Sequence, residues 1–429
     1  MAGPKALGTI QPPPTDIMTF PQPTRTSSGS VLTGDTSPRS GATLSSVQRR
    51  AGVRWMLALG AILAATVATA QMNPLDAPTT PYVYGPLSLR PSVLYHFRYD
   101  LGLLAERGRH VASEINTFDP SLAMDVGTHW TLVYNPSWTD YTARALHDIS
   151  EQAFSTVGSL AFEDVAASLS EAYVSSDQIL AETGTQTAQK TWATALHVTA
   201  KLGNRWELES NDSLNERFTD ISSDTRDWLT QDFATLRLSS RTTAALGVGL
   251  GYTEILHRPD SYYERYLCRY NWTPSDKVTL ALEGGTEVRH STASSVPVMN
   301  NPLLNSTLTL RPFETTSIMF AGSRTTTPSV LQDLLETGWV WSSSIDQRLF
   351  GRFDLVVNYT HTDTDYRSLT ANAAANRSDQ LDNFGARISV MLRKRLQLAA
   401  VFNRFMNSSD VTGFSYNRTE YGFDVGFSY

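Results

Sequence analysis

Apolar and polar residues alternate one by one over most of the chain, from about residue 87 to the carboxy terminus. The alternation is clearest in the segments 87–99, 130–138, 246–253, 352–359 and 384–392. Successive side chains of a β-strand point to opposite faces, so each segment has one apolar face and one polar or small face. No convincing helical period interrupts this pattern, which predicts an all-β chain.

Short turns recur about every 35–45 residues, the length of two membrane strands and one loop. They are expected near 127–128, 159–160, 203–204, 240–241, 274–276, 312–313, 350–351 and 394. Longer polar links lie between them, most clearly at 100–109, 176–187, 219–225, 292–300, 367–377 and 409–414. The pattern predicts a closed antiparallel up-and-down transmembrane β-barrel of about 18 strands, with short periplasmic turns and longer extracellular loops.

Ionisable residues interrupt the apolar face at a restricted distance from the turns. Each lies eight to twelve residues from the nearest predicted short turn, at Glu171, Asp232, Arg324, His361 and Arg404. A tilted strand crosses a bilayer in about 9–11 residues, and a charge is tolerated near the bilayer edge. We therefore expect these residues where the strands leave the hydrocarbon.

Aromatic residues mark the opposite boundary of the apolar face. Five lie within a few residues of a predicted short turn: Trp130, Trp206, Trp272, Phe313 and Phe353. On an outward face they would form an interfacial girdle. The alternative is ordinary core packing of aromatic side chains at strand ends.

The amino-terminal region has the pattern of a secretory signal peptide. Arg49, Arg50 and Arg54 precede an uncharged apolar run that ends in a small-residue cleavage pattern between Ala70 and Gln71. The alternative is a membrane anchor, but the run is shorter than the ~20 residues of a helical span.

These features divide the chain into four parts. Residues 1–48 are rich in Pro, Ser, Thr and Gly and are predicted to be a disordered leader, which a mis-assigned start codon would explain. Residues 49–70 are the signal peptide, 71–86 a short periplasmic segment and 87–429 the transmembrane barrel.

The carboxy terminus ends on an alternating aromatic strand. Its apolar positions are Tyr421, Phe423, Val425, Phe427 and Tyr429, so the final residue is aromatic. This resembles the terminal β-signal that the barrel-assembly machinery of outer membranes reads. Together with an export signal, it favours the cell outer membrane as the location, with outer-membrane lipids as partners.

Net charge and cysteine content argue against a nucleic-acid partner and exclude an internal disulfide. The whole chain carries −7, and removal of six basic and two acidic residues with segment 1–70 leaves −11, which argues against nucleic acid as a partner. The single cysteine, Cys268, permits no internal disulfide and is best explained as apolar filler on the outward face.

Several turn and loop stretches resemble the "putative β-barrel porin 2" type of outer-membrane protein. They are Asp119-Pro120-Ser121-Leu122, the stretch 127–132, the stretch 182–187, Pro312-Phe313-Glu314-Thr315-Thr316 and Asn376-Arg377-Ser378-Asp379. The resemblance covers about residues 85–429. It implies an outer-membrane barrel without a defined substrate, and some related barrels are associated with exopolysaccharide export.

The chain shows no pattern typical of a catalytic, cofactor or metal site. None of the eight histidines has metal-ligand spacing, and Gly247, Gly249 and Gly251 do not match a dinucleotide fingerprint. These glycines are expected to leave space inside the barrel or to allow a bend. The chain is therefore predicted not to be an enzyme. A barrel enzyme that uses His96 or His197 remains an alternative.

The polar face is mixed in charge and is expected to line the interior. The candidate lining residues are Arg90, Arg98, Lys201, Glu207, Glu209, Arg237, Arg265, Arg269, Glu283, Glu287, Arg352, Asp354 and Arg387. Barrels of 16–18 strands leave an aqueous channel, so the sequence predicts a porin-like channel for small polar solutes or saccharides, with a loop such as 176–187 or 367–377 able to fold inward. Two alternatives remain: a non-conducting barrel with a structural or polysaccharide-export-associated role, and a soluble exported β-propeller.

Overall fold

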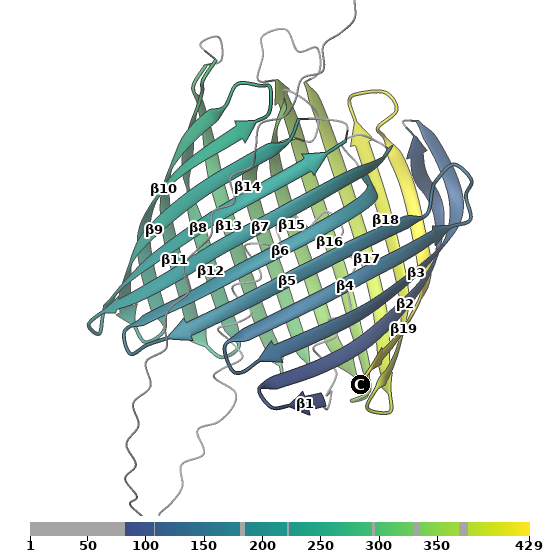
Figure 1. The fold of residues 1–429 in the computed structure, drawn as a ribbon, viewed down its shortest axis with the longest axis horizontal. Coiled ribbons are helices and arrows are strands. Elements are labelled where there is room, and N and C mark those ends of the chain that lie inside the picture. The colour runs from purple at the N-terminus through teal and green to yellow at the C-terminus, as the bar shows by residue number, and fades with distance from the viewer. Residues whose placement is uncertain are drawn as a thin grey trace, which may run out of the picture. The chain divides into compact units, whose positions relative to one another are not determined.

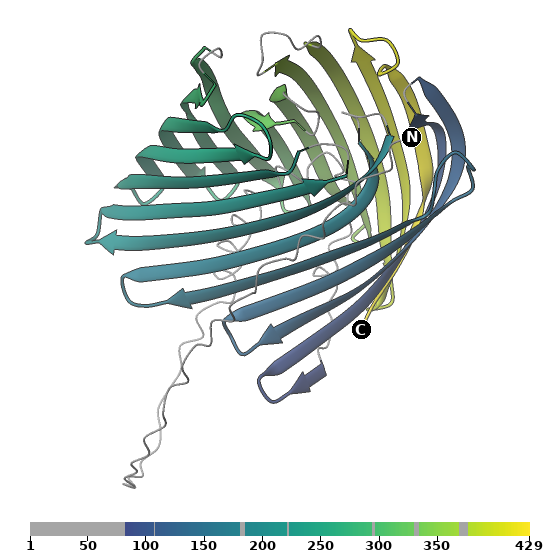
Figure 2. The same cartoon turned by 45° about the horizontal axis from the view of Figure 1, so that its top comes forward.

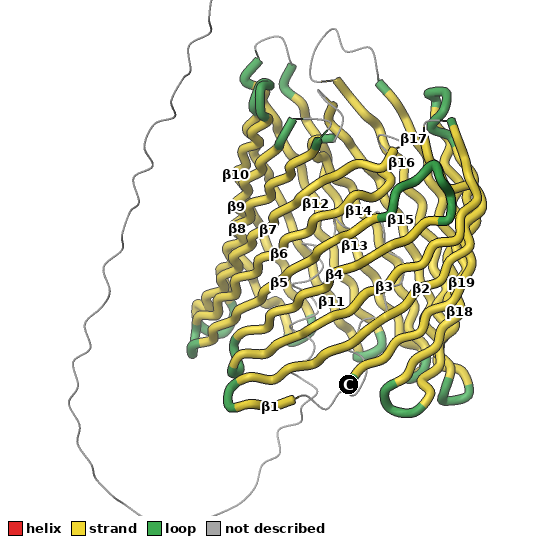
Figure 3. Tube along the Cα trace, turned by 45° about the vertical axis from the view of Figure 1, so that its right-hand side comes forward, coloured by secondary structure: helices red, strands yellow, loops and turns green. Residues whose placement is uncertain are grey.

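The structure, a computed structural model, describes residues 82–106, 108–180, 185–220, 223–293, 297–329, 334–368 and 376–429. The predicted leader, signal peptide and most of the short segment that follows lie outside the described residues. All regular elements in the described part are strands (Figure 3). Accordingly, this part of the chain contains no helix long and apolar enough to span a membrane.

Nineteen strands are described. They are β1 (Tyr82–Tyr84), β2 (Leu87–Glu106), β3 (Arg109–Val126), β4 (Trp130–Tyr141), β5 (Ile149–Ala161), β6 (Val165–Leu180), β7 (Thr185–Leu202), β8 (Trp206–Thr219), β9 (Thr225–Ser239), β10 (Thr242–Ile255), β11 (Ser261–Ser275), β12 (Val278–Ser291), β13 (Met299–Phe313), β14 (Thr316–Pro328), β15 (Leu334–Leu349), β16 (Phe353–Ser368), β17 (Arg377–Leu392), β18 (Leu396–Ser409) and β19 (Tyr416–Ser428).

The strands β2 to β19 form one closed antiparallel barrel. Each pairs with the next along the chain, and β19 pairs with β2 over a register that runs from Thr419 opposite Leu101 to Ser428 opposite Ser92. Figure 1 shows the tilted strands, and Figure 2 shows them enclosing one interior. This confirms the predicted closed up-and-down barrel of 18 strands, to which β1 adds only a short hairpin with β2.

The connections alternate between two ends of the barrel, here called the short-turn end and the link end. The turns at 127–129, 203–205 and 350–352 lie where the sequence predicts them, whereas the turn after β5 falls at 162–164, slightly later than expected. The predicted link 100–109 is wrong, because β2 continues to Glu106 and β3 begins at Arg109. Register shifts after Leu101 and Leu104 absorb the irregular sequence there without ending the pairing.

The barrel strands carry apolar side chains outward and polar or small side chains inward. The inward face is identified by contacts between strands that are not neighbours: Arg269 of β11 lies 2.8 Å from Glu209 of β8, which only side chains on the concave face can do. On β10 the outward Leu246 and Leu250 are 73% and 67% exposed, whereas the inward Phe233 of β9 is 2% exposed. This sidedness is the reverse of that of a water-soluble protein.

Two rows of outward aromatic side chains bound the apolar band. The row at the short-turn end holds the five predicted residues Trp130, Trp206, Trp272, Phe313 and Phe353, all of them exposed. A second row near the link end includes Trp138, Trp192, Trp228, Tyr252 and Tyr262, also exposed. The alternative that the five predicted aromatic residues pack in a core is therefore wrong.

Outward ionisable residues lie near the second aromatic row or between it and the short-turn end. Arg324, His361 and Arg404 are each eight residues from the short-turn end of their strand, whereas Glu171 and Asp232 are six and seven residues from it. The outward face is therefore not interrupted at one height only. Two carboxylates lie deeper in the apolar band than the sequence indicates.

The two ends of the barrel sequence meet at the seam between β19 and β2. Across it, Phe97 stacks on Phe423 and Tyr99 packs on Tyr421, with ring centroids 5.3 and 5.5 Å apart. At the short-turn end, β1 lies beside the carboxy terminus (Figure 1), and the rings of Tyr82 and Tyr429 stack at 4.3 Å. The predicted terminal β-signal thus forms an outward aromatic row that closes the barrel.

Candidate functional site

Charged side chains on the inward face gather in two sectors on opposite walls. One sector covers β17, β18, β19, β2 and β3, and the other covers β8 to β12. In the ring of 18 strands, β2 and β11 are nine strands apart, so the two sectors face each other across the interior. The barrel interior is therefore the candidate functional site.

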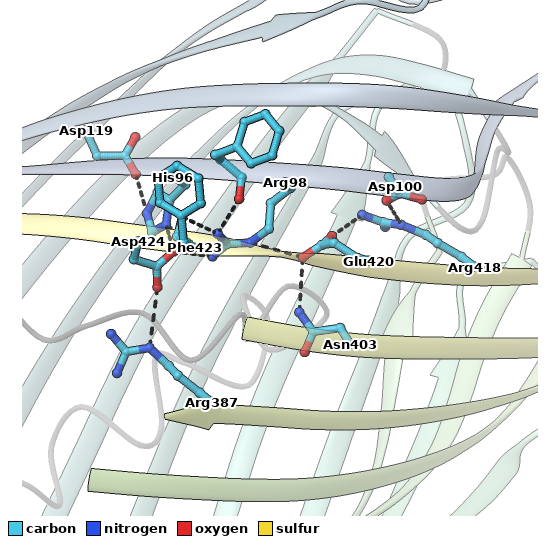
Figure 4. A network of polar contacts seen from close by, with 11 residues as sticks. His96, Arg98, Asp100, Asp119, Arg387, Asn403, Arg418, Glu420, Phe423 and Asp424 are labelled. Carbon is cyan, nitrogen blue, oxygen red and sulfur yellow. Dashed lines mark hydrogen bonds and ion pairs between the residues drawn. The ribbon is translucent and has the colours of Figure 1, made fainter. Parts of the chain in front are cut away.

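The first sector contains a row of alternating charges along the seam (Figure 4). Arg98 lies 2.5 Å from Asp424 and 3.3 Å from Glu420. Arg418 lies 2.7 Å from Glu420 and also pairs with Asp100. With the Arg387 Nε, 3.4 Å from Asp424, these six side chains form the seam ladder: Arg387, Asp424, Arg98, Glu420, Arg418 and Asp100.

Further polar side chains attach to the seam ladder. His96 contacts Asp424 at 2.7 Å and Asp119 at 3.1 Å, which links β2 to both of its neighbours. The Asn403 amide donates to Glu420 at 3.0 Å. Because buried charges need partners, this network makes a charged wall compatible with a folded barrel.

The second sector, here called the β8–β12 wall, is more fully paired. Glu287 is buried between Arg265 and Arg289, each 2.9 Å away. Arg269 bridges Glu209 at 2.8 Å and Glu283 at 2.9 Å. Every arginine in this group has at least one carboxylate partner at hydrogen-bond distance, so the wall holds little unused charge.

Aromatic rings pack over glycines in the same wall. The Phe233 ring covers Gly247 and the Tyr263 ring covers Gly251, so a Cβ at either glycine would overlap the ring. The Arg269 guanidinium carbon lies 3.9 Å from the Phe233 ring centroid. The sequence predicts that these glycines leave open space inside the barrel. For Gly247 and Gly251 this is wrong, because an aromatic ring that stiffens the wall packs over each of them.

The walls between the two charged sectors carry mostly small and neutral side chains. On β6 and β7 the inward positions include Ser170 opposite Ala195, Ala172 opposite Ala193, and Ser168. On β14 and β15 they include Ser323, Thr325, Ser342 and Ser344. Hydroxyl groups therefore line the interior on both sides between the charged walls.

The link 142–148 between β4 and β5 covers part of the link end of the interior. The Ala143 backbone N–H donates to Ser113 Oγ on the inward face of β3, and Leu146 packs on Ile115 and Leu103. The backbone N–H and carbonyl of His147 both hydrogen-bond to the Gln186 side chain on β7. The centres of the two loops predicted to fold inward, 181–184 and 369–375, lie outside the described residues, so that expectation stays a prediction.

The strands place the predicted lining residues at several heights. Arg98, Glu209, Arg265, Arg269, Glu283, Glu287 and Arg387 belong to the two charged sectors just described. Others lie nearer the short-turn end: Arg90 pairs with Asp125 at 2.8 Å, Asp354 pairs with Arg348 at 3.0 Å, Lys201 lies opposite Glu207 on the neighbouring strand, and Arg237 is close to the end of β9.

Arg352 is placed differently from the prediction. It lies in the turn between β15 and β16, because β16 begins at Phe353. The backbone φ angles of Phe350 and Gly351 are 51° and 68°, so the turn breaks the alternation that precedes it. Arg352 is therefore at the barrel rim and not on the inward wall.

Sequence reasoning missed several members of the seam ladder. Arg418 and Glu420 have the same inward parity as Asp424, but the alternating pattern was followed only from Tyr421. Asp100 was assigned to a link, although β2 continues through it. Extending the period of two by a few residues at each strand would have identified all three.

The described residues contain no group of three or more His, Cys, Asp or Glu side chains arranged to hold a metal ion. His197 lies on the inward face, with Nδ1 2.6 Å from Asn211 Oδ1. Cys268 is exposed on the outward face opposite Leu246.

Comparisons with known proteins give distant structural neighbours. The chain is similar to OccK2 (OpdF) of Pseudomonas aeruginosa (TM-score 0.44, 11% identity, 79% of this chain and 98% of that one). It is also similar to OpdL of the same species (0.42, 12%, 81% and 99%) and to the siderophore receptor PirA of Acinetobacter baumannii (0.41, 8%, 82% and 81%).

No protein-family model and no curated protein matches the chain. Structural similarity this distant says nothing about what enters the barrel. The resemblance to the "putative β-barrel porin 2" type therefore stays a prediction.

Proposed function

We propose that this chain is an outer-membrane β-barrel whose interior is a passive channel for small polar solutes or saccharides. The single observation that carries the proposal is the sidedness of the sheet, with exposed Leu246 and Leu250 outward and ion pairs such as Arg269–Glu209 inward. A closed sheet with an apolar exterior bounded by aromatic rows fits a lipid bilayer. An 18-strand barrel is too wide for side chains alone to fill.

The proposal also includes how the chain is exported and inserted into the outer membrane. Export would depend on residues 49–70, with cleavage between Ala70 and Gln71, as the sequence pattern predicts. The barrel-assembly machinery would read the aromatic row that ends at Tyr429. The aromatic rows at both strand ends would then lie at the two bilayer interfaces, among outer-membrane lipids.

Selectivity would come from the inward walls. Charged groups on opposite sides attract polar solutes, and the neutral walls between them offer hydroxyl groups for hydrogen bonds. No step of bond making or breaking is needed, so the proposed function is transport by diffusion. The link 142–148 lies against the inward wall at the link end, and the described residues form no separate plug domain.

Conductance in planar bilayers tests the proposal. Purified barrel that shows heat-dependent mobility on SDS gels should produce discrete current steps. A matched pair of tryptophan variants locates the path: Ser170→Trp on the inward face should reduce the conductance, and Leu169→Trp on the outward face should leave it unchanged. A folded barrel without current, or equal effects of both variants, would refute the channel.

The alternative non-conducting role rests on the inward link. Its contacts with Ser113 and Ile115 hold segment 142–148 against the interior wall. If the wild-type barrel is silent and removal of residues 143–147 produces current, the link closes the pore and an export-associated role becomes the better explanation.

A further inference from the structure

Three planar side chains form a stack on the outward face of β14 and β15, towards the link end. The Trp341 ring packs over Gly322, where a Cβ would lie 2.6 Å from the ring. Trp339 stacks on Trp341, with ring centroids 5.6 Å apart and an interplanar angle of 8°. The Arg324 guanidinium carbon lies 5.0 Å from the Trp339 ring centroid. An aromatic face attracts a cation, so this stack holds the Arg324 guanidinium in place.

Arg324 has no anionic partner in the described part of the chain. Its Nε is buried without a hydrogen-bond partner. Its outward cross-strand neighbours are Leu304 and Trp339, and neither side chain offers an acceptor. By contrast, the outward Arg226 of β9 lies 2.7 Å from Glu216. A charged donor without an acceptor is costly in an apolar setting, and an anionic ligand would relieve that cost.

The depth of Arg324 places it near a membrane interface. It lies eight residues from Thr316, the first residue of β14. At about 3.3 Å per residue and a strand tilt of about 40°, this is roughly 20 Å into an apolar band about 25 Å tall. Long cationic side chains near the edge of the band extend towards the headgroups. The anions available at that level are the phosphates of lipid headgroups.

A pair of carboxylates lies beside the stack on β16 and β17. Asp363 is the cross-strand neighbour of Trp339, and its Oδ2 lies 3.1 Å from His361 Nε2. His361 Nδ1 lies 2.8 Å from Asp382 Oδ1, so the histidine orients both carboxylates. Asp363 Oδ1 is buried without a hydrogen-bond partner among the described residues, and it can accept from a hydroxyl group. Trp339 separates Asp363 from Arg324 in the register, so an anion at the guanidinium need not touch the carboxylate.

We propose that Arg324, held by Trp339, binds the phosphate of a phosphorylated glycolipid in the membrane leaflet at the link end. The guanidinium would donate to the phosphate oxygens, and Asp363 Oδ1 would accept from a sugar hydroxyl group. This inference rests on the proposed membrane location of the barrel and not on conduction through its interior.

Arg404 of β18 is an arginine at the same depth without a stack. It also faces outward and lies eight residues from the short-turn end of its strand, at Leu396. It is exposed, and the described residues give it no ion pair, hydrogen bond or ring contact. A general attraction between outward cations and anionic lipids would involve Arg404 as much as Arg324. A built site would depend on Arg324 alone.

Native mass spectrometry of the detergent-solubilised barrel measures lipid binding. Diphosphorylated lipid A is the probe, and fully dephosphorylated lipid A is the comparison lipid. The phosphorylated lipid should bind more tightly to the wild-type barrel. Arg324→Gln should weaken its binding about tenfold, the effect of losing a charge-assisted hydrogen bond, and should leave binding of the dephosphorylated lipid unchanged.

Matched variants separate the site from its surroundings. Arg404→Gln removes the same charge at the same depth and should change the affinity far less than Arg324→Gln. Trp339→Leu should weaken binding although Arg324 remains, because the guanidinium loses its aromatic support. Arg324→Lys keeps a cation and should retain more affinity than Arg324→Gln. All variants are first checked for heat-dependent mobility on SDS gels.

Three outcomes would overturn the site. They are equal wild-type affinity for the two lipids, equal losses in Arg404→Gln and Arg324→Gln, and displacement of the bound lipid by an equal concentration of inorganic phosphate. A wild-type dimer that Arg324→Gln dissociates would assign this face to a second copy of the chain and overturn it as well. The test is independent of the channel, because Arg324-dependent lipid binding by a barrel that carries no current supports the site and refutes only conduction.

Discussion

The outward orientation of the apolar face predicts opposite costs for the same substitution at adjacent positions. Ile345 and Ser344 are neighbours on β15. Ile345 faces outward between Ile318 and Val357, and Ser344 faces inward between Met319 and Asn358. Replacing each with arginine places the same charge on opposite sides of one strand, and the different strand propensities of isoleucine and serine account for about 1 kcal/mol at most.

The magnitude follows from the position of Ile345 in the apolar band. It lies four residues from Leu349, the last residue of β15. At about 3.3 Å per residue and a strand tilt of about 40°, this places it roughly 10 Å from the short-turn boundary of a band about 25 Å tall. Arginine near the bilayer midplane costs about 2–4 kcal/mol, so Ile345→Arg should lower the folding equilibrium constant by roughly two decades.

The assay is urea titration of barrels folded into phospholipid vesicles, with the heat-resistant SDS band as the measure of the folded fraction. Ser344→Arg should shift the unfolding midpoint little, because an arginine on a hydrated wall keeps its solvation, and such surface changes cost about 0.5 kcal/mol or less. Equal shifts for the two variants, or a larger shift for Ser344→Arg, would refute the assigned sidedness and the bilayer location with it.

Three more predictions follow from the interior and the seam. Gly251→Val should destabilise the barrel by about 1–3 kcal/mol through overlap with the Tyr263 ring, and urea titration should show partial recovery when Tyr263→Ala is added. Asp424→Asn removes the carboxylate shared by Arg98, Arg387 and His96, so the reversal potential in a salt gradient should shift toward anion selectivity; an unchanged potential would show that the ladder does not face the conducting path. Tyr429→Ala removes the ring that stacks on Tyr82 and should slow assembly into vesicles, which time-resolved gel mobility measures.

The fold could be predicted because strand alternation and turn spacing are local properties of the chain. The period of two identifies the outward face on nearly every strand, and turns such as 127–129 and 350–352 lie where the sequence places them. Errors arose where the local pattern was irregular. Segment 100–109 lost its alternation at two register shifts, and Arg352 was given a face although it lies in a turn.

The partners of the inward charges could not be predicted. Arg98 and Asp424 are 326 residues apart in the sequence, and they meet only because β19 closes on β2 in one particular register. Alternation gives the face of a side chain but not its height on the barrel wall, which depends on tilt and register together. For the same reason, the inward position of segment 142–148 depends on the distant acceptor Ser113 on β3 and not on its length.

The two charged walls differ in a way that bears on selectivity. On the β8–β12 wall, Arg265, Arg269 and Arg289 form ion pairs, and the Tyr263 ring packs over Gly251. A solute in the proposed channel would therefore meet few unpaired polar groups there. Along the seam ladder the charges alternate, so their fields largely cancel at a distance of a few ångströms. The long-range electrostatic field of either wall therefore distinguishes only weakly between solutes. Discrimination should arise at short range, where a solute contacts individual side chains of the wall directly.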